Sequence, residues 1–119
     1  MLVVFANNQV LVANTSTTVT VTTDPVPVGD NNRATGITNV HGIFNDGAAG
    51  LSWKMQVSND GQTWEDQGPS TGVISAVGSS LEAPTTVSCV YARLEISFQA
   101  SGAGLGAATF DVHVNFDRA

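Results

Sequence analysis

The sequence predicts an all-β protein, folded as a single β-sandwich of the jelly-roll or immunoglobulin-like kind with about seven to nine antiparallel strands. Apolar and polar residues alternate at period two along several stretches, which is typical of strands with one buried face. Clusters of Gly, Asn, Asp and Pro separate these stretches, and helical periodicity is hard to find. Without helices to cover a sheet, two sheets must cover each other. The length of 119 residues fits one domain over residues 1–119.

The first third of the chain is rich in β-branched residues. Residues 1–8 are expected to form either an arm or an edge strand, and residues 10–13 and 17–23 read as strands. Two prolines and a Gly-Asp-Asn-Asn cluster then predict a long exposed loop over residues 24–34. A strand is expected over residues 35–44, followed by a turn at Asn45-Asp46-Gly47.

The middle of the chain holds both tryptophans on either side of a turn signal. Alternation predicts that Trp53 is buried, together with Leu51, Met55 and Val57. Asn59-Asp60-Gly61 supplies residues that tolerate positive φ, so residues 62–66 should return as an antiparallel partner. Trp64 is then expected to pack near one end of the face that carries Trp53.

The last part of the chain gives the clearest strands. A break is expected over residues 68–72, a short strand over 73–77 and a turn over 78–80. Residues 90–98 and 110–116 alternate strictly and predict two long strands. The Gly-rich linker 101–106 suits a hairpin or a loop pressed against a neighbouring subunit.

Charge and cysteine content limit the partners. The net charge of −6 repels phosphate backbones and anionic lipids, so neither nucleic acid nor a membrane is expected as a partner. The apolar run at residues 2–6 is too short for a signal sequence or a membrane span, so the chain is expected to be made in the cytoplasm. Cys89 is the only cysteine and reads as a small buried hydrophobe.

No constellation predicts catalysis, a metal or a cofactor. Glu65 and Asp66 are adjacent, so in a strand their carboxylates would point to opposite faces. The two histidines lie on separate predicted strands without metal-ligand spacing. Calcium at the loop aspartates is the open alternative to ordinary turn chemistry. These aspartates are Asp30, Asp46 and Asp60.

Two groups of residues are candidates for an interface. One group would lie on the outward faces of three strong strands, where Tyr and Arg are favoured contact residues, although a plain solvated face is the alternative. It comprises Lys54, Tyr91, Arg93, Glu95, Asp111 and His113. The other group is apolar and could add a strand to the edge of a neighbour's sheet. It comprises Leu2, Val3, Val4 and Phe5.

Three stretches resemble a pattern found in small β-sandwich structural proteins of tailed bacteriophages. They are "WKMQVSNDGQTWED", "VYARLEISF" and "GAATFDVHVNF". The resemblance implies a decoration, cement or fibre-associated role without a catalytic centre. The expected function is thus a capsid decoration or cement protein that binds capsid or other virion proteins as a homo-oligomer. The alternative is a carbohydrate-binding or adhesin-like module in which Trp64 presents its ring to a sugar.

Overall fold

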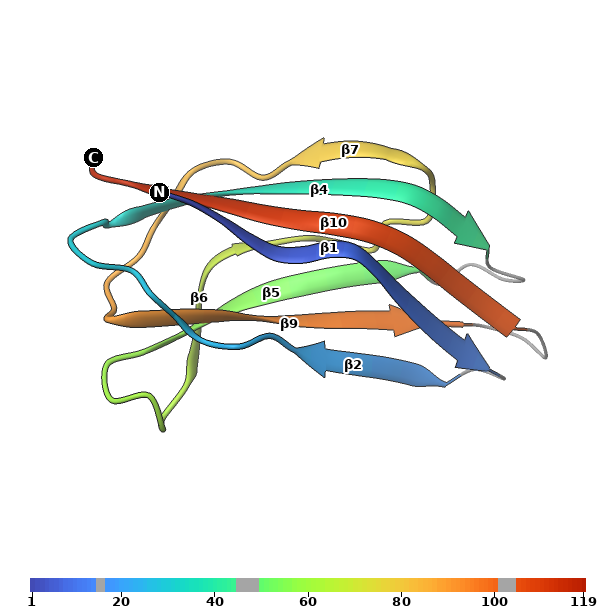
Figure 1. Ribbon diagram of the computed structural model, residues 1–119, viewed down its shortest axis with the longest axis horizontal. Helices are drawn as coiled ribbons and strands as arrows, with labels where there is room; N and C mark the ends of the chain where they lie inside the picture. The colour runs from blue at the N-terminus through green and yellow to red at the C-terminus, as the bar shows by residue number, and fades with distance from the viewer. Residues whose placement is uncertain (15–16, 45–49, 101–104) are drawn as a thin grey trace.

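The protein is all-β, in a computed structural model that describes residues 1–14, 17–44, 50–100 and 105–119. None of these segments is a helix that could cross a membrane. Two antiparallel sheets stack on each other, and both chain ends lie at the same end of the sandwich (Figure 1). The strands are β1 (Leu2–Asn14), β2 (Thr18–Thr22), β3 (Val26–Pro27), β4 (Arg33–Phe44), β5 (Leu51–Ser58), β6 (Glu65–Ser70), β7 (Gly78–Leu81), β8 (Thr85–Thr86), β9 (Tyr91–Gln99) and β10 (Leu105–Asp117).

The order of the strands is that of a jelly roll. Sheet A runs β1-β10-β4-β7, with β8 on the same edge of β4 as β7. Sheet B runs β2-β9-β5-β6, with β3 on the same edge of β9 as β2. β7 and β8 together take the place of one strand, and so do β2 and β3. The first strand of the chain pairs with the last. Each sheet then alternates strands from the two halves of the chain, as in two interlocked Greek keys and unlike an immunoglobulin domain.

The period-two pattern places the core where the sequence predicts it. On β5, β9 and β10, alternate side chains point between the sheets and are almost wholly buried, while their neighbours are partly exposed. Each large side chain buried in this way contributes about 1.5–3 kcal/mol. The largest fully buried side chains are Trp53, Phe98, Phe110, Phe116, Leu51, Met55, Leu94, Ile96, Val28, Val87, Val112 and Val114.

Trp53 ties the two sheets together. It belongs to sheet B, yet its ring reaches across the core to Gly36 of sheet A, where a Cβ atom would collide with the indole. Its Nε1 donates a hydrogen bond of 2.7 Å to Oγ1 of Thr38, which is itself fully buried. A glycine and a hydroxyl on β4 are therefore matched to one indole on β5.

The loop expected over residues 24–34 is shorter and less exposed than its prolines suggest. Val26 and Pro27 form β3 against β9, and Val28 is fully buried. Proline is tolerated here because β3 lies at the edge of sheet B, where an amide donor can be missing. β4 begins already at Arg33, and its pairing closes the loop.

We call the turn at Asn59-Asp60-Gly61, between the two tryptophans, the tryptophan turn. The segment between this turn and β9 also differs from expectation. β6 starts at Glu65 and includes Gly68 and Pro69, where a break is expected, because a register shift in its pairing with β5 accommodates them. The short strand expected over 73–77 reduces to a single bridge between Ile74 and Leu51. Residues 78–80, expected as a turn, belong to β7, which is held as an edge strand by β4.

Replacing Thr38 with Val should destabilise the protein by about 1–3 kcal/mol, because the buried Trp53 N–H loses its acceptor while the side-chain volume stays similar. Denaturant unfolding followed by tryptophan fluorescence measures the change. Thr35→Val, on the outward face of the same strand, is the matched control and should change stability little. Equal effects of the two changes would show that the indole bond contributes nothing.

Candidate functional site

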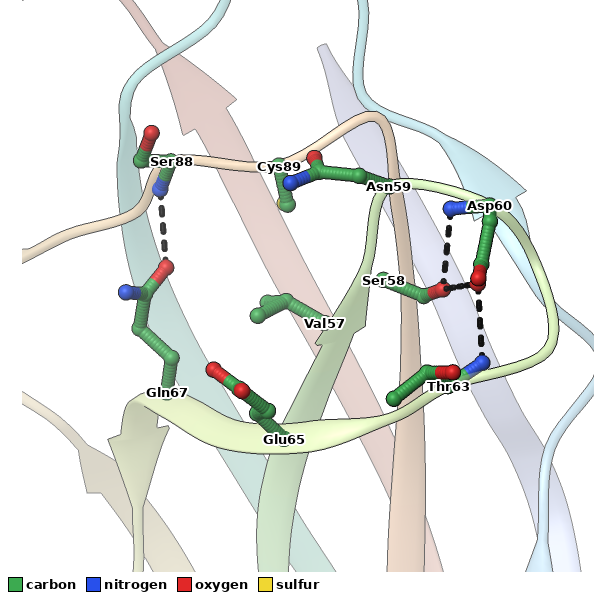
Figure 2. A pocket seen from close by; sticks show the side chains of 9 residues that line it. All are labelled: Val57, Ser58, Asn59, Asp60, Thr63, Glu65, Gln67, Ser88 and Cys89. Atoms are coloured by element: carbon green, nitrogen blue, oxygen red, sulfur yellow. Dashed lines mark hydrogen bonds between the residues drawn. The ribbon is translucent and has the colours of Figure 1, made fainter.

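A cavity of about 270 Å³ opens at the end of sheet B where β5 turns into β6 (Figure 2). We call it the loop-end cavity. β5, the tryptophan turn, β6 and the segment before β9 all contribute to it. Gln67 fixes one wall, because its Oε1 accepts a hydrogen bond of 2.8 Å from the main-chain N–H of Ser88. The lining residues are Val57, Ser58, Asn59, Asp60, Thr63, Glu65, Gln67, Ser88 and Cys89.

Asp60 serves the turn beside this cavity. Its Oδ1 accepts hydrogen bonds of 2.8 Å from the main-chain N–H groups of Gln62 and Thr63, and one of 3.0 Å from the Ser58 hydroxyl. These donors favour the charged carboxylate and lower the pKa of Asp60 to about 2. The local geometry is that of an Asx-type turn, and Gly61 supplies the positive φ of 75° that the chain reversal needs.

The chemistry available in the loop-end cavity is limited. Cys89 is half-buried, and burial raises the pKa of its thiol, which keeps the thiol protonated and weakly nucleophilic. In the described part of the chain, no three His, Cys, Asp or Glu side chains gather as a metal site. Asp46, one of the loop aspartates considered for calcium, lies outside the described residues.

The outward face of sheet B carries a ladder of polar side chains that bind one another. Nζ of Lys54 lies 3.1 Å from Oδ2 of Asp66 and 3.9 Å from Oε1 of Glu95 on the two neighbouring strands. Asp66 raises the pKa of Lys54 through this hydrogen bond, and Lys54 lowers the pKa of Asp66 in return. Because solvent screens these exposed or partly exposed charges, the two pairs contribute little to the stability of the fold.

Trp64 lies on this same outward face, so the expectation that it packs near the buried face of Trp53 is wrong. The guanidinium carbon of Arg93 lies 4.1 Å from the centroid of the Trp64 ring, a cation–π contact. Nε of Arg93 also donates to Oε1 of Gln56 at 3.0 Å. Trp64, which follows the turn, therefore lies over Arg93 on the outward side of β9, and its indole is only partly exposed. Tyr91 is partly exposed near Gly61 of the turn.

A polar groove of about 350 Å³ lies farther along the outward side of sheet B. Its hydroxyl and charged groups come from β5, from β6 with the adjoining Thr71, and from β9. Nζ of Lys54 and the carboxylate of Glu95 supply opposite charges on one side. The residues are Ser52, Trp53, Lys54, Ser70, Thr71, Glu95 and Ser97.

Asp111 and His113 lie elsewhere, so the outward residues of the three strong strands do not form one patch. Both residues are on β10, which belongs to sheet A, whereas Lys54, Arg93 and Glu95 are on the outward face of sheet B. A sandwich has two outward faces, and strands that are equally clear in sequence can belong to either sheet. This division could not be derived from strand spacing alone.

Asp111 fixes a bulge in β1 from this second face. Its Oδ1 accepts a hydrogen bond of 2.6 Å from the main-chain N–H of Asn8, a residue with a φ of 49°. Its Oδ2 lies 2.8 Å from Nε2 of His41 on β4. The Asn8 bond, and then His41, lower the pKa of the Asp111 carboxyl. Asp111 thus joins three strands within one chain.

The apolar residues at the amino end form part of sheet A. Leu2, Val3 and Val4 pair with β10, while Phe5 lies at a register shift and packs partly against the core, as Val3 also does. Leu2 and Val4 point outward and are more than half exposed. These residues belong to an edge strand that continues to Asn14.

An apolar patch on the outward face of sheet A is the feature that sequence reasoning missed. Val12 pairs with Ala107, which pairs with Phe44, so a row of three apolar side chains crosses β1, β10 and β4 on one face. Phe44 is 61% exposed. The sequence signal was present, because residues 10–13 are apolar on both alternating faces. The apolar patch consists of Val10, Val12, Phe44, Leu105 and Ala107.

The chain matches no protein-family model, and a search of curated proteins finds no related sequence. The resemblance to phage structural proteins therefore rests on the three sequence stretches that carry it.

Replacing Asp60 with Asn should reduce the loss of stability in acid. The lowered pKa of Asp60 means that its charged form stabilises the fold above the usual pKa of 3.8, and that this contribution disappears as the pH falls toward about 2. Unfolding free energies measured between pH 5 and pH 2 should fall more steeply for the wild type than for Asp60→Asn. Parallel curves for the two proteins would contradict this role.

Proposed function

We propose that this chain is a structural protein of a bacteriophage virion, a capsid decoration or cement protein that binds the particle surface as a homo-oligomer. The observation that carries the proposal is the apolar patch on sheet A. Contiguous exposed apolar surface of this kind marks sites that contact another protein. Val10, Val12, Phe44 and Leu105 are each more than half exposed, so no described segment covers the patch.

The two outward faces of the sandwich differ in polarity, which supports the proposal. Sheet B presents charged and polar groups that are paired with one another, so this face is suited to solvent. Sheet A presents aliphatic and aromatic groups that gain free energy when they are covered. A decoration protein needs such a contrast, with one face against the shell and another outward.

Charge and fold agree with this role without deciding it. The net charge of −6 gives an outward surface that does not compete for packaged nucleic acid. Jelly rolls occur in viral capsid domains and also in lectins, so the architecture alone leaves both candidate functions open. The three phage-like sequence stretches favour the virion.

Replacing Phe44 with Ser should lower co-sedimentation with capsid particles that lack this protein by about tenfold or more, because an exposed aromatic anchor of an interface commonly contributes 2 kcal/mol or more. Val90→Ser, which alters an exposed apolar residue next to β9 at the other end of the sandwich, is the matched control. Wild-type protein that stays in the supernatant would overturn the proposal.

The sheet-B groove favours one second candidate, a carbohydrate-binding module. Its serine hydroxyls and its Lys54 and Glu95 groups could bind sugar hydroxyls, and the partly exposed ring of Trp64 lies on the same face. Because Arg93 covers one face of that ring, at most the other face is open for stacking. This arrangement fits a sugar less well than the apolar patch fits a protein.

If the carbohydrate function holds, binding on a glycan array should be lost in Trp64→Ala and should survive in Phe44→Ser. If the particle function holds, binding to capsid particles should instead be lost in Phe44→Ser and survive in Trp64→Ala, since Trp64 and Phe44 lie on opposite outward faces. Arrays with the wild type and both variants separate the two functions.

A further inference from the structure

β1 pairs with β10 along one edge, and its other edge, over residues 2–12, is the longest free strand edge in the described part of the chain. We propose that two copies of this chain associate about a two-fold axis by antiparallel pairing of their β1 edges, which joins their A sheets into one continuous sheet. The inference deepens the proposed function and rests on it for the homo-oligomeric role.

At the start of β1, alternate residues direct their main-chain N–H and C=O groups to the edge that faces away from β10. The Met1 amino group donates to the carbonyl of Phe116 at 2.6 Å, and the Phe116 N–H donates to the carbonyl of Met1 at 2.8 Å. In antiparallel pairs, residues that exchange both bonds alternate with residues that direct both groups to the other side. Leu2 and Val4 therefore direct their N–H and C=O groups to the free edge.

The end of β1 independently shows the same alternation of main-chain direction. Asn14 pairs with Leu105 in the ladder, yet its carbonyl accepts from the Thr17 N–H at 3.2 Å and its N–H donates to the Thr17 hydroxyl at 3.0 Å. Its main-chain groups thus face away from β10. By the same alternation, Val12 and Val10 also direct their N–H and C=O groups to the free edge, where the Val10 carbonyl accepts a long, exposed hydrogen bond of 3.4 Å from Nε2 of Gln9 that pairing would displace.

These four residues are complementary to themselves in one two-fold register. If the axis passes beside residue 7, Leu2 lies opposite Val12 of the second copy, and Val4 lies opposite Val10. The N–H and C=O groups that point to the free edge of one copy then meet those of the other copy, so each pair can exchange two hydrogen bonds. All four side chains lie on the outward face and are between 51% and 57% exposed, so aliphatic groups meet aliphatic groups across the junction.

The bulges of β1 coincide with the proposed axis. Register shifts occur between Val4 and Ala6 and between Ala6 and Gln9, and Asp111 holds the bulged main chain at Asn8. The paired arms, residues 2–4 and 10–12, flank this centre symmetrically. The unpaired middle limits the register to one choice, because a slipped pairing would place a bulge against a regular arm.

Charge also favours a second copy at this edge. Proteins usually protect long edges with Lys, Pro or inward charges, and β6, an edge of sheet B, carries Glu65, Asp66 and Pro69. Residues 2–14 contain neither proline nor an ionisable side chain, although the chain has a net charge of −6. Two copies with the same net charge can therefore meet along the edge of β1 without placing like charges opposite each other.

Cysteine cross-linking tests the register. In a Cys89→Ser background, Val4→Cys and Val10→Cys are made as separate proteins, mixed and oxidised. Opposed residues in such a pair lie about 5.5 Å apart at Cα, within disulfide range. The mixture should give covalent dimers and each variant alone should not. Dimers from either variant alone, or none from the mixture, would overturn the register.

Sedimentation equilibrium tests the dimer without cysteines. The wild type should have twice the chain mass of 12.3 kDa, and Val4→Lys combined with Val10→Lys should be monomeric with unchanged circular dichroism. Leu81→Lys, on the opposite edge of sheet A and 70% exposed, is the matched control and should remain dimeric. A monomeric wild type, or an open-ended series of oligomers, contradicts the two-fold pairing.

The outcomes separate this inference from the proposed function. A dimer that ignores capsid particles would overturn the particle role and leave β1 pairing intact. A monomer that co-sediments with particles, and loses this with Phe44→Ser, would overturn the pairing alone.

Discussion

The contact of Trp53 with β4 is the constraint on which the rest of the sandwich depends. The indole crosses from sheet B to sheet A, occupies the space that Gly36 leaves free, and donates to the buried hydroxyl of Thr38. Two sheets without a covering helix can slide relative to each other unless something specific fixes them. A large ring with one polar atom does so, because only one relative placement satisfies both its shape and its N–H.

Once the sheets are fixed, their outward faces acquire different properties. On sheet B, Lys54, Glu95 and Asp66 satisfy one another, and Arg93 covers Trp64. On sheet A, the side chains of Asp111 and His41 bind each other, and Asp111 holds the bulge of β1. The apolar residues beside them have no such partner among the described residues, and covering them lowers the free energy.

This contrast gives a physical account of assembly. Pairing along β1 would bring the apolar rows of two copies together, so that the apolar patches of both lie on one outward face of a joined sheet. A particle surface could then contact both patches at once. Two linked contacts bind more tightly than one because the second forms within the same complex. The bulge that Asp111 holds would serve as the centre of that arrangement.

The sequence by itself determined the all-β class, the buried alternation of β5, β9 and β10, and the turn at Asp60, because period-two burial and turn chemistry are local properties. It did not determine which strands share a sheet. The separation of Asp111 from Lys54, the outward position of Trp64 over Arg93, and the strand formed by residues 78–81 all depend on partners distant in sequence. Only the tertiary structure decided these, since an edge strand or an exposed ring is stabilised by whichever neighbour the topology brings beside it.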